Sequence, residues 1–185
     1  MDRGAENYRR FLDGDDEGIS EIVRDYKDCL ILFLNTIVGN IYTAEELAEE
    51  TFFRLIIKKP RYSGKSSFKS WLFAVGRNIA VDHIRRFSRT APGLTEEMEA
   101  SLKDESDLEA EYLKEERKKQ IRAAIRKLPE DYGAVLWLVY FEGLSSEETA
   151  TVMKKNSRQM RNLLYRAKQS LKSELEKEGF VYEEF

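Results

Sequence analysis

Apolar residues recur at spacings of three and four along most of this chain, and this repeat constrains the fold more than any other feature. The clearest run comprises Ile19, Ile22, Val23, Tyr26, Leu30, Phe33, Leu34 and Ile37. Such spacing places one apolar stripe along an α-helix. Gly39 follows the run and is expected to end the helix. The stripe predicts that this helix buries one face against other helices.

The same period predicts further helices over about 43–59, 67–88, 106–127, 130–141 and 146–153, and from 157 onward. Proline or glycine separates several of them, at Pro60, Pro129 and Gly143. Three of the predicted helix starts carry a capping box, in which a Thr or Ser side chain and a Glu three residues later satisfy each other's backbone N–H. These boxes are Thr43 with Glu46, Ser106 with Glu109, and Ser145 with Glu148. The fold class expected is all-α.

A linker is predicted where the helical period fails, from about residue 90 to 110. It divides the chain into two small helical domains, 1–89 and 111–178, with a tail at 179–185. Between residues 95 and 116 there are ten acidic residues against only Lys103 and Lys114. This acidic stretch either folds against basic surfaces of the domains and lowers their affinity for other anions, or it is a solvated linker.

Composition excludes several classes of site. The longest apolar run, 134–141, is far shorter than the roughly 20 residues of a membrane span, and no stretch resembles a signal peptide, so a cytoplasmic protein is expected. With Cys29 and His83 as the only residues of their types, an internal disulfide or a zinc site of Cys and His ligands cannot form. Cys29 is interpreted as a core residue, with redox sensing as the alternative. No cofactor, metal site or catalytic residue is expected.

A helix-turn-helix is predicted in the second domain. The short helix over 146–153 is followed by the turn Lys154-Lys155-Asn156 and by a helix that Ser157 is expected to cap. In this motif the second helix enters the major groove of DNA. Its own buried stripe consists of Met160, Leu163, Leu164, Ala167 and Leu171.

Charge supports the same interpretation independently. The segment 153–172 contains no Asp or Glu, and its basic residues are Lys154, Lys155, Arg158, Arg161, Arg166, Lys168 and Lys172. A run of one sign attracts phosphate. A solvated helix face is the simpler alternative, but such a face normally mixes charges to gain pairs at spacings of three and four. Near the helix start, Arg158, Gln159, Arg161 and Asn162 are residue types that recognise base edges.

The first domain has a basic region of its own, in which aromatic residues are interspersed. Its cations are Arg61, Lys65, Lys69, Arg77, Arg85, Arg86 and Arg89, with Asp82 as the one acid among them. Tyr62 and Trp71 either stack on unpaired bases or pack in the core. Asn78 and Asp82 share a helix face with the arginines at 85 and 86, and are expected to orient them.

Both halves, in this order, resemble the extracytoplasmic-function (ECF) sigma factors of bacterial RNA polymerase. The segment 45–55, EELAEETFFRL, is similar to the family's polymerase-binding helix, and 68–86, FKSWLFAVGRNIAVDHIRR, to the segment that opens and recognises the promoter element nearer the start site. In the second half the resemblance rests on Leu128-Pro129-Glu130, on 141–145 and on 165–168. It covers about residues 16–172, apart from the linker.

The resemblance implies three groups of functional residues. Polymerase contacts would come from Glu46, Leu47, Glu49, Glu50, Phe53 and Arg54. The melted element would be bound by Tyr62, Lys65, Ser66, Ser67, Lys69, Arg77, Asn78, Arg85 and Arg86, with the 62–67 loop holding a flipped base. The upstream element would be bound by Ser157, Arg158, Gln159, Arg161, Asn162, Tyr165, Arg166 and Lys168. The implied partners are core RNA polymerase, promoter DNA and an anti-sigma factor.

Some positions depart from the family's usual pattern. Thr149 stands where a branched aliphatic residue is common, Lys154 where glycine often makes the turn, and Gln159-Met160 where Thr-Val is frequent.

Two other classes of function remain as alternatives from the residues alone. One is a helix-turn-helix regulator that does not bind polymerase, and the other is a nucleic-acid-processing enzyme.

Overall fold

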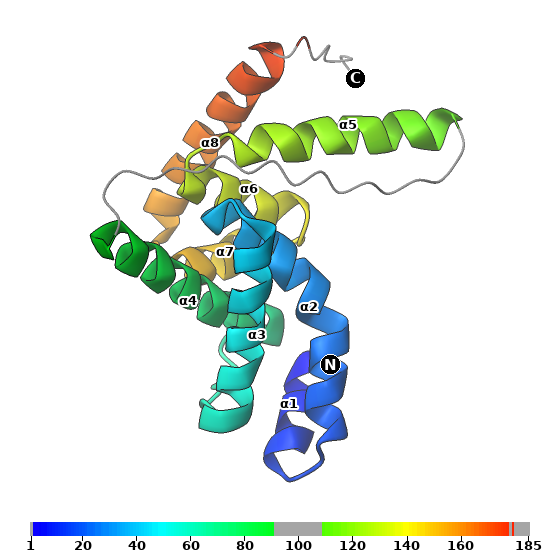
Figure 1. Cartoon of the computed structure of the whole chain (residues 1–185), viewed down its shortest axis with the longest axis vertical. Helices are drawn as coiled ribbons and strands as arrows, with labels where there is room; N and C mark the ends of the chain where they lie inside the picture. The colour runs from blue at the N-terminus through cyan, green and yellow to red at the C-terminus, as the bar shows by residue number, and fades with distance from the viewer. Residues whose placement is uncertain (1, 91–108, 178, 180–185) are drawn as a thin grey trace.

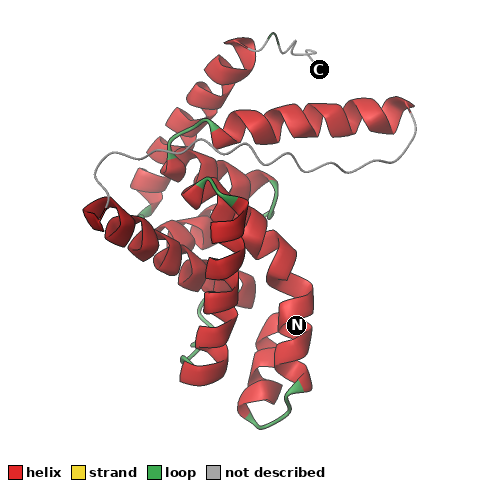
Figure 2. Ribbon diagram, in the orientation of Figure 1, coloured by secondary structure: helices red, strands yellow, loops and turns green. Residues whose placement is uncertain are grey.

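The computed structural model describes residues 2–90, 109–177 and 179, without the side chains of 88–90 and 109–117. In these ranges the elements are α1 (Arg3–Leu12), α2 (Glu17–Val38), α3 (Ile41–Lys58), α4 (Phe68–Thr90), α5 (Glu109–Arg126), α6 (Glu130–Tyr140), α7 (Ser146–Met153) and α8 (Ser157–Lys177), all helices (Figures 1 and 2). The all-α prediction is confirmed. The predicted linker and the side chains of its acidic stretch, 95–116, lie almost wholly outside the described residues.

The longest apolar stripe forms α2, as predicted. Ile22, Leu30, Phe33 and Leu34 are fully buried along one face. Gly39 ends the helix in the left-handed region at φ 69°, where its N–H donates to the carbonyl of Asn35. Glycine is favoured there because it has no Cβ to clash with the following carbonyl. Among the described helices, none is both long enough and apolar enough to cross a bilayer.

The helix α1 was not predicted, and it ties the start of the chain to α4. Asp2 caps α1 by accepting from the N–H of Ala5, and its other carboxylate oxygen accepts from the N–H of Phe68 at 2.6 Å. Tyr8 is almost completely buried, and its hydroxyl donates to the carbonyl of Pro60. Through these contacts α1 supports the loop before α4 and the first turn of α4.

The two halves of the chain pack against each other around one continuous core. In the first half α2 packs on α1, α3 and α4, and in the second α6 packs on α7 and α8. Between the halves, α2 packs on α6 and α4 packs on α7 (Figure 1). Gly133 permits the close approach of α6, because a Cβ there would lie 3.2 Å from the carbonyl oxygen of Ile125 and 3.6 Å from that of Thr36.

Two predicted helix starts are wrong in detail. The helix α3 begins two residues before Thr43, and Asn40 is its cap, accepting from the N–H of Thr43 at 3.0 Å. The box predicted between Thr43 and Glu46 therefore does not cap this helix. At α8 the cap is Asn156, and Ser157 is the first helical residue. In both cases an Asn one to three residues upstream satisfies the exposed N–H groups instead.

Candidate nucleic-acid interface and apolar groove

The helix-turn-helix is formed by α7 and α8. At the start of α7, Ser145 accepts from the N–H of Glu148 at 3.2 Å while the Glu148 carboxylate accepts from the N–H of Ser145 at 2.9 Å, so the predicted capping box is confirmed. The turn passes through Lys154, which adopts the left-handed conformation with φ 52° and ψ 45°. This is the position that glycine would occupy without strain.

The polar face of α8 points to solvent. Met160 and Ala167 are buried against the rest of the domain. All the residues predicted to bind the upstream element are exposed, namely Ser157, Arg158, Gln159, Arg161, Asn162, Tyr165, Arg166 and Lys168. Gln159 also has a structural role, since its side-chain oxygen accepts from the N–H of Asn156. The helix thus presents a basic surface of the kind that a major groove accepts.

The residues predicted to bind the melted element divide into two groups. Lys65, Arg85 and Arg86 are exposed, and Arg85 lies 3.9 Å from Asp82, in agreement with the predicted orienting role of that acid. The partly buried group comprises Tyr62, Ser66, Ser67, Lys69, Arg77 and Asn78. Of this group, Ser67, Lys69 and Arg77 contact acidic residues of the second half.

Tyr62 and Trp71 belong to an aromatic cluster. Their ring centroids lie 5.3 Å apart, and each ring also packs on Phe68, at 5.7 Å from Tyr62 and 5.4 Å from Trp71. The Tyr62 hydroxyl donates to the carbonyl of Ser66. Edge-on and tilted contacts of this kind stabilise aromatic clusters. The contacts favour the interpretation that both rings pack against the core.

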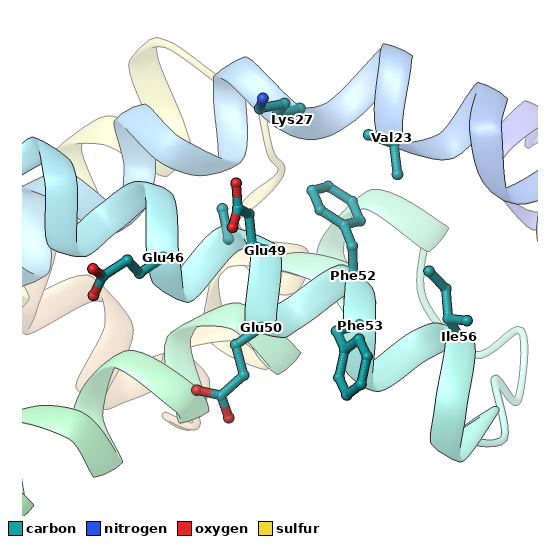
Figure 3. Close-up of a pocket in the computed structure, with 9 residues that line it drawn as sticks. Val23, Lys27, Glu46, Glu49, Glu50, Phe52, Phe53 and Ile56 are labelled. Atoms are coloured by element: carbon teal, nitrogen blue, oxygen red, sulfur yellow. The ribbon is translucent and has the colours of Figure 1, made fainter.

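A groove of about 610 Å³ lies between α2 and α3 (Figure 3). Val23 and Lys27 of α2 form one side, and the α3 residues that line it are Glu46, Ala48, Glu49, Glu50, Phe52, Phe53 and Ile56. Phe52 is buried, whereas Phe53 is 62% exposed. An exposed apolar surface bordered by carboxylates is typical of a protein-docking site.

Five of the six predicted polymerase-binding residues have side chains at or near this surface, and Leu47 does not. Its side chain is only 3% exposed and packs in the core, so the prediction of a direct contact for Leu47 is wrong. Tyr42 and Ile57, which are not among the predicted contacts, are 63% and 62% exposed on α3. Their large apolar side chains at helical spacing from Phe53 and Ile56 were the available signal.

Three acidic residues of the second half were also missed. Asp131, Glu142 and Glu148 contact basic or hydroxyl side chains of α4 or the residue before it, over separations of 54 to 81 residues along the chain. Nothing local in the sequence marks such pairs.

Comparison with known proteins gives a family match for each half of the chain. Residues 22–90 match the family described as sigma-70 region 2, and residues 118–171 match sigma-70 region 4. The chain is 28% identical over 171 residues to the RNA polymerase sigma-H factor of Pseudomonas aeruginosa, covering 88% of this chain and 89% of that protein. It is 30% identical over 139 residues to the ECF RNA polymerase sigma factor SigC of Mycobacterium tuberculosis, covering 75% and 74%.

The chain belongs to the ECF RNA polymerase sigma factors. The resemblance stated from the residues is thereby confirmed. In this ECF sigma factor, α3, α4 and most of α2 fall in region 2, and α6, α7 and most of α8 fall in region 4.

Solved structures support the fold of this ECF sigma factor. The sigma factor RpoE of Bartonella quintana, in complex with the anti-sigma factor NepR, superposes with a TM-score of 0.70 at 20% identity, over 85% of this chain and 96% of that one. CnrH, in complex with the cytosolic domain of CnrY, superposes with a TM-score of 0.63 at 19% identity, over 95% and 97%.

Proposed function

We propose that this ECF sigma factor binds core RNA polymerase through the groove between α2 and α3 and directs it to specific promoters. The groove carries this proposal. It presents Phe53 to solvent beside the carboxylates of Glu46 and Glu49, on the segment that resembles the polymerase-binding helix of the family. An ordinary helix-turn-helix regulator has no need for such a surface on its other domain.

Promoter recognition is assigned to two surfaces. The exposed basic face of α8 would enter the major groove of the upstream element, with Arg158, Arg161 and Asn162 at base edges. The N-terminal part of α4 and the 62–67 loop would hold unpaired bases of the melted element. The chain would supply no catalysis, and bond formation would belong to the polymerase.

We infer that the chain acts in the cytoplasm, together with the polymerase, and that an anti-sigma factor controls it. The inference of an anti-sigma partner is supported by the first solved structure described above, in which the sigma factor RpoE is in complex with the anti-sigma factor NepR. The chemistry of the groove fits a partner with basic and apolar side chains.

Purified chain and core polymerase test the polymerase part of the proposal. Capture of the core enzyme on immobilised chain at physiological salt is expected, as are discrete transcript starts when the two are incubated with genomic DNA. A chain that binds DNA but captures no polymerase would be a helix-turn-helix regulator instead.

Salt titration tests the assignment of α8. Arg161→Ala is expected to lower promoter affinity of the polymerase complex and to reduce the slope of log affinity against log salt by about 1, because one positive charge close to the phosphates is lost. Lys177→Ala is the matched control, since this lysine lies on the same helix but pairs with Glu174 at 3.0 Å. Equal slopes for the two variants would contradict the assignment of α8 to the DNA interface.

A further inference from the structure

The first helix, α1, holds both ends of the loop that joins α3 to α4, residues 59–67. Near the start of this loop, the hydroxyl of Tyr8 donates to the carbonyl of Pro60 at 2.8 Å. At its end, the Asp2 carboxylate accepts from the N–H of Phe68, the first residue of α4, at 2.6 Å. Because both contacts come from one short helix and its cap, the two ends of the loop are fixed relative to each other.

Asp2 caps two helices with one carboxylate. One oxygen accepts from the N–H of Ala5 in α1 at 3.2 Å, and the other accepts from the N–H of Phe68 in α4. The N–H groups in the first turn of a helix have no partner within the helix and lie at the positive end of its dipole. A side chain with a single acceptor oxygen could serve only one of the two helices.

The ring of Phe68 is where α1 packs on the start of α4. Phe68 is fully buried, and its ring centroid lies 5.6 Å from that of Tyr8. Gly4 of α1 lies directly against the same ring, since a Cβ at Gly4 would be 2.5 Å from the Cδ1 atom of Phe68. Packing and the Asp2 hydrogen bond thus fix the same relative position of α1 and α4.

Tyr8 is suited to hold the other end of the loop. It is only 1% exposed, and its ring also packs on Trp71, with the centroids 5.3 Å apart. Burial raises the pKa of Tyr8 to about 12, so the hydroxyl keeps its proton at neutral pH and can donate. Pro60 has no N–H, and its carbonyl is therefore the one backbone group through which this residue can be held by a hydrogen bond.

The middle of the loop is accessible to a ligand. Ser63, Gly64 and Lys65 are exposed, and Gly64 turns the chain in the left-handed region at φ 70°. Inside the loop, the Tyr62 hydroxyl donates to the carbonyl of Ser66. A hydroxyl, exposed backbone and a cation are groups that contact the edge of an unpaired base and its phosphate. The loop is therefore held at its ends and open at its middle.

We propose that Asp2 and Tyr8 are positioning residues for promoter opening, which hold the loop over 59–67 in the shape that selects one unpaired base. The proposal rests on the binding of the melted element assigned to this loop in the preceding subsection. A loop that already has its binding shape loses less entropy when the base arrives, and it fits other bases less well. The helix α1 lies outside the match to sigma-70 region 2, which begins at residue 22.

Two variants each release one end of the loop. Asp2→Ser keeps a good cap for α1, but its single, shorter oxygen cannot also reach the N–H of Phe68. Tyr8→Phe keeps the ring and removes the donor. The matched controls are Asp16→Ser, at an exposed Asp whose side chain does not cap α2, and Tyr26→Phe, which removes a hydroxyl beside the same Phe68 ring.

Limited proteolysis of the full chain by trypsin tests whether α1 holds the loop. Cleavage after Arg61 and Lys65, two exposed residues of the loop, is followed by mass spectrometry, with cleavage after Arg158 as the internal reference. Both variants are expected to be cut in the loop at least about threefold faster than wild type, because proteases cut segments that open locally. The controls should be cut at the wild-type rate. Wild-type rates for both variants would overturn the proposal.

Base selection by the complex with core polymerase tests the functional part. The probe is a single-stranded DNA library with a randomised segment, and the bound fraction is sequenced. Asp2→Ser and Tyr8→Phe are expected to lower the preference for one base by about fivefold, the order expected when one positioning hydrogen bond is lost. The loss should occur at the same position in both variants, with the other positions unchanged.

A merely structural role gives a different result. It would reduce the amount of bound DNA for all sequences alike and leave every base preference at the wild-type value. Such a uniform loss, or unchanged preferences, would overturn the proposal. Failure of the proposed function is recognised separately, because the wild-type chain would then capture no core polymerase.

The trypsin experiment contains neither polymerase nor DNA, so it decides in either case whether α1 fixes the loop.

Discussion

Asn156 and Gln159 hydrogen-bond each other's backbone at the start of α8. The Asn156 side chain accepts from the N–H of Gln159 at 2.9 Å, and the Gln159 side chain accepts from the N–H of Asn156 at 3.0 Å. This is the geometry of a capping box with Asn and Gln in place of Ser and Glu. A residue in a base-recognition position is therefore also part of the helix cap.

Gln159→Glu separates these two roles. A Glu at this position keeps the cap and is favoured by the positive end of the helix dipole, so the melting temperature should be unchanged or slightly higher. Promoter affinity should fall about tenfold or more, because the new carboxylate faces phosphate. Gln120→Glu, an exposed site on α5, is the control and should not change the affinity. A variant that lost stability would show that the cap depends on the amide.

Lys154→Gly should stabilise the protein. Lys154 has φ 52°, a conformation that costs a residue with a Cβ about 1–2 kcal/mol and costs glycine nothing. After the greater entropy loss of glycine is subtracted, the free energy of unfolding should rise by about 0.5–1 kcal/mol, as measured by chemical denaturation. Lys154→Ala removes the same charge but keeps the Cβ. Equal stabilities for the two variants would argue against strain at this turn.

Phe53→Ala should weaken polymerase binding with little effect on folding. The side chain is 62% exposed, so unfolding should change by less than about 0.5 kcal/mol. Affinity for core polymerase should fall about tenfold or more, as for an aromatic residue at the centre of an interface. The control is Phe87→Ala, which removes the same side chain at 55% exposure from α4. An equal loss in both variants would mean that the effect is not specific to the groove.

Cys29 reports on the contact between the halves. Burial, followed by the charge of Glu142, raises the pKa of the Cys29 thiol from 9.0 to about 11. Since only the thiolate reacts, alkylation by iodoacetamide should be slow at pH 8 and should accelerate about tenfold per pH unit up to pH 10. Glu142→Gln should speed the reaction at fixed pH, and Glu147→Gln should not. A rate that levels off near pH 9 would contradict the raised pKa.

Local signals predicted the helix-turn-helix and α2 well. Gly39 and the Ser145–Glu148 box lie at the end or start of their helices, where the backbone groups they satisfy are only a few residues away. The start of α3 was wrong because Asn40 offers an equally good acceptor three residues before Thr43. Short polar side chains close together compete for the same N–H groups, and sequence alone does not rank them.

Long-range contacts could not be predicted from the sequence. The apolar stripe of α1, with Tyr8 and Phe11 buried, is too short to predict a helix. The contact between Asp2 and the N–H of Phe68 cannot be predicted from the residues near either one. Likewise, nothing in the local sequence distinguishes Glu142 from other acids beside a turn, because its partner Lys69 is brought close only by the fold. Exposure also requires the fold, as Leu47 and Phe53 show within one helix.

The burial of α6 on every side limits how region 4 can be exchanged between related sigma factors. Residues 133–138 are all buried, because one side of the helix faces its own domain and another faces α2 near Thr36. Region 4 therefore cannot be exchanged between relatives without affecting the contact between α6 and α2. A region 4 transplanted from a relative would meet the α2 surface of a different protein. The graft must therefore be matched to that surface if α6 is to pack on α2 in the chimaera.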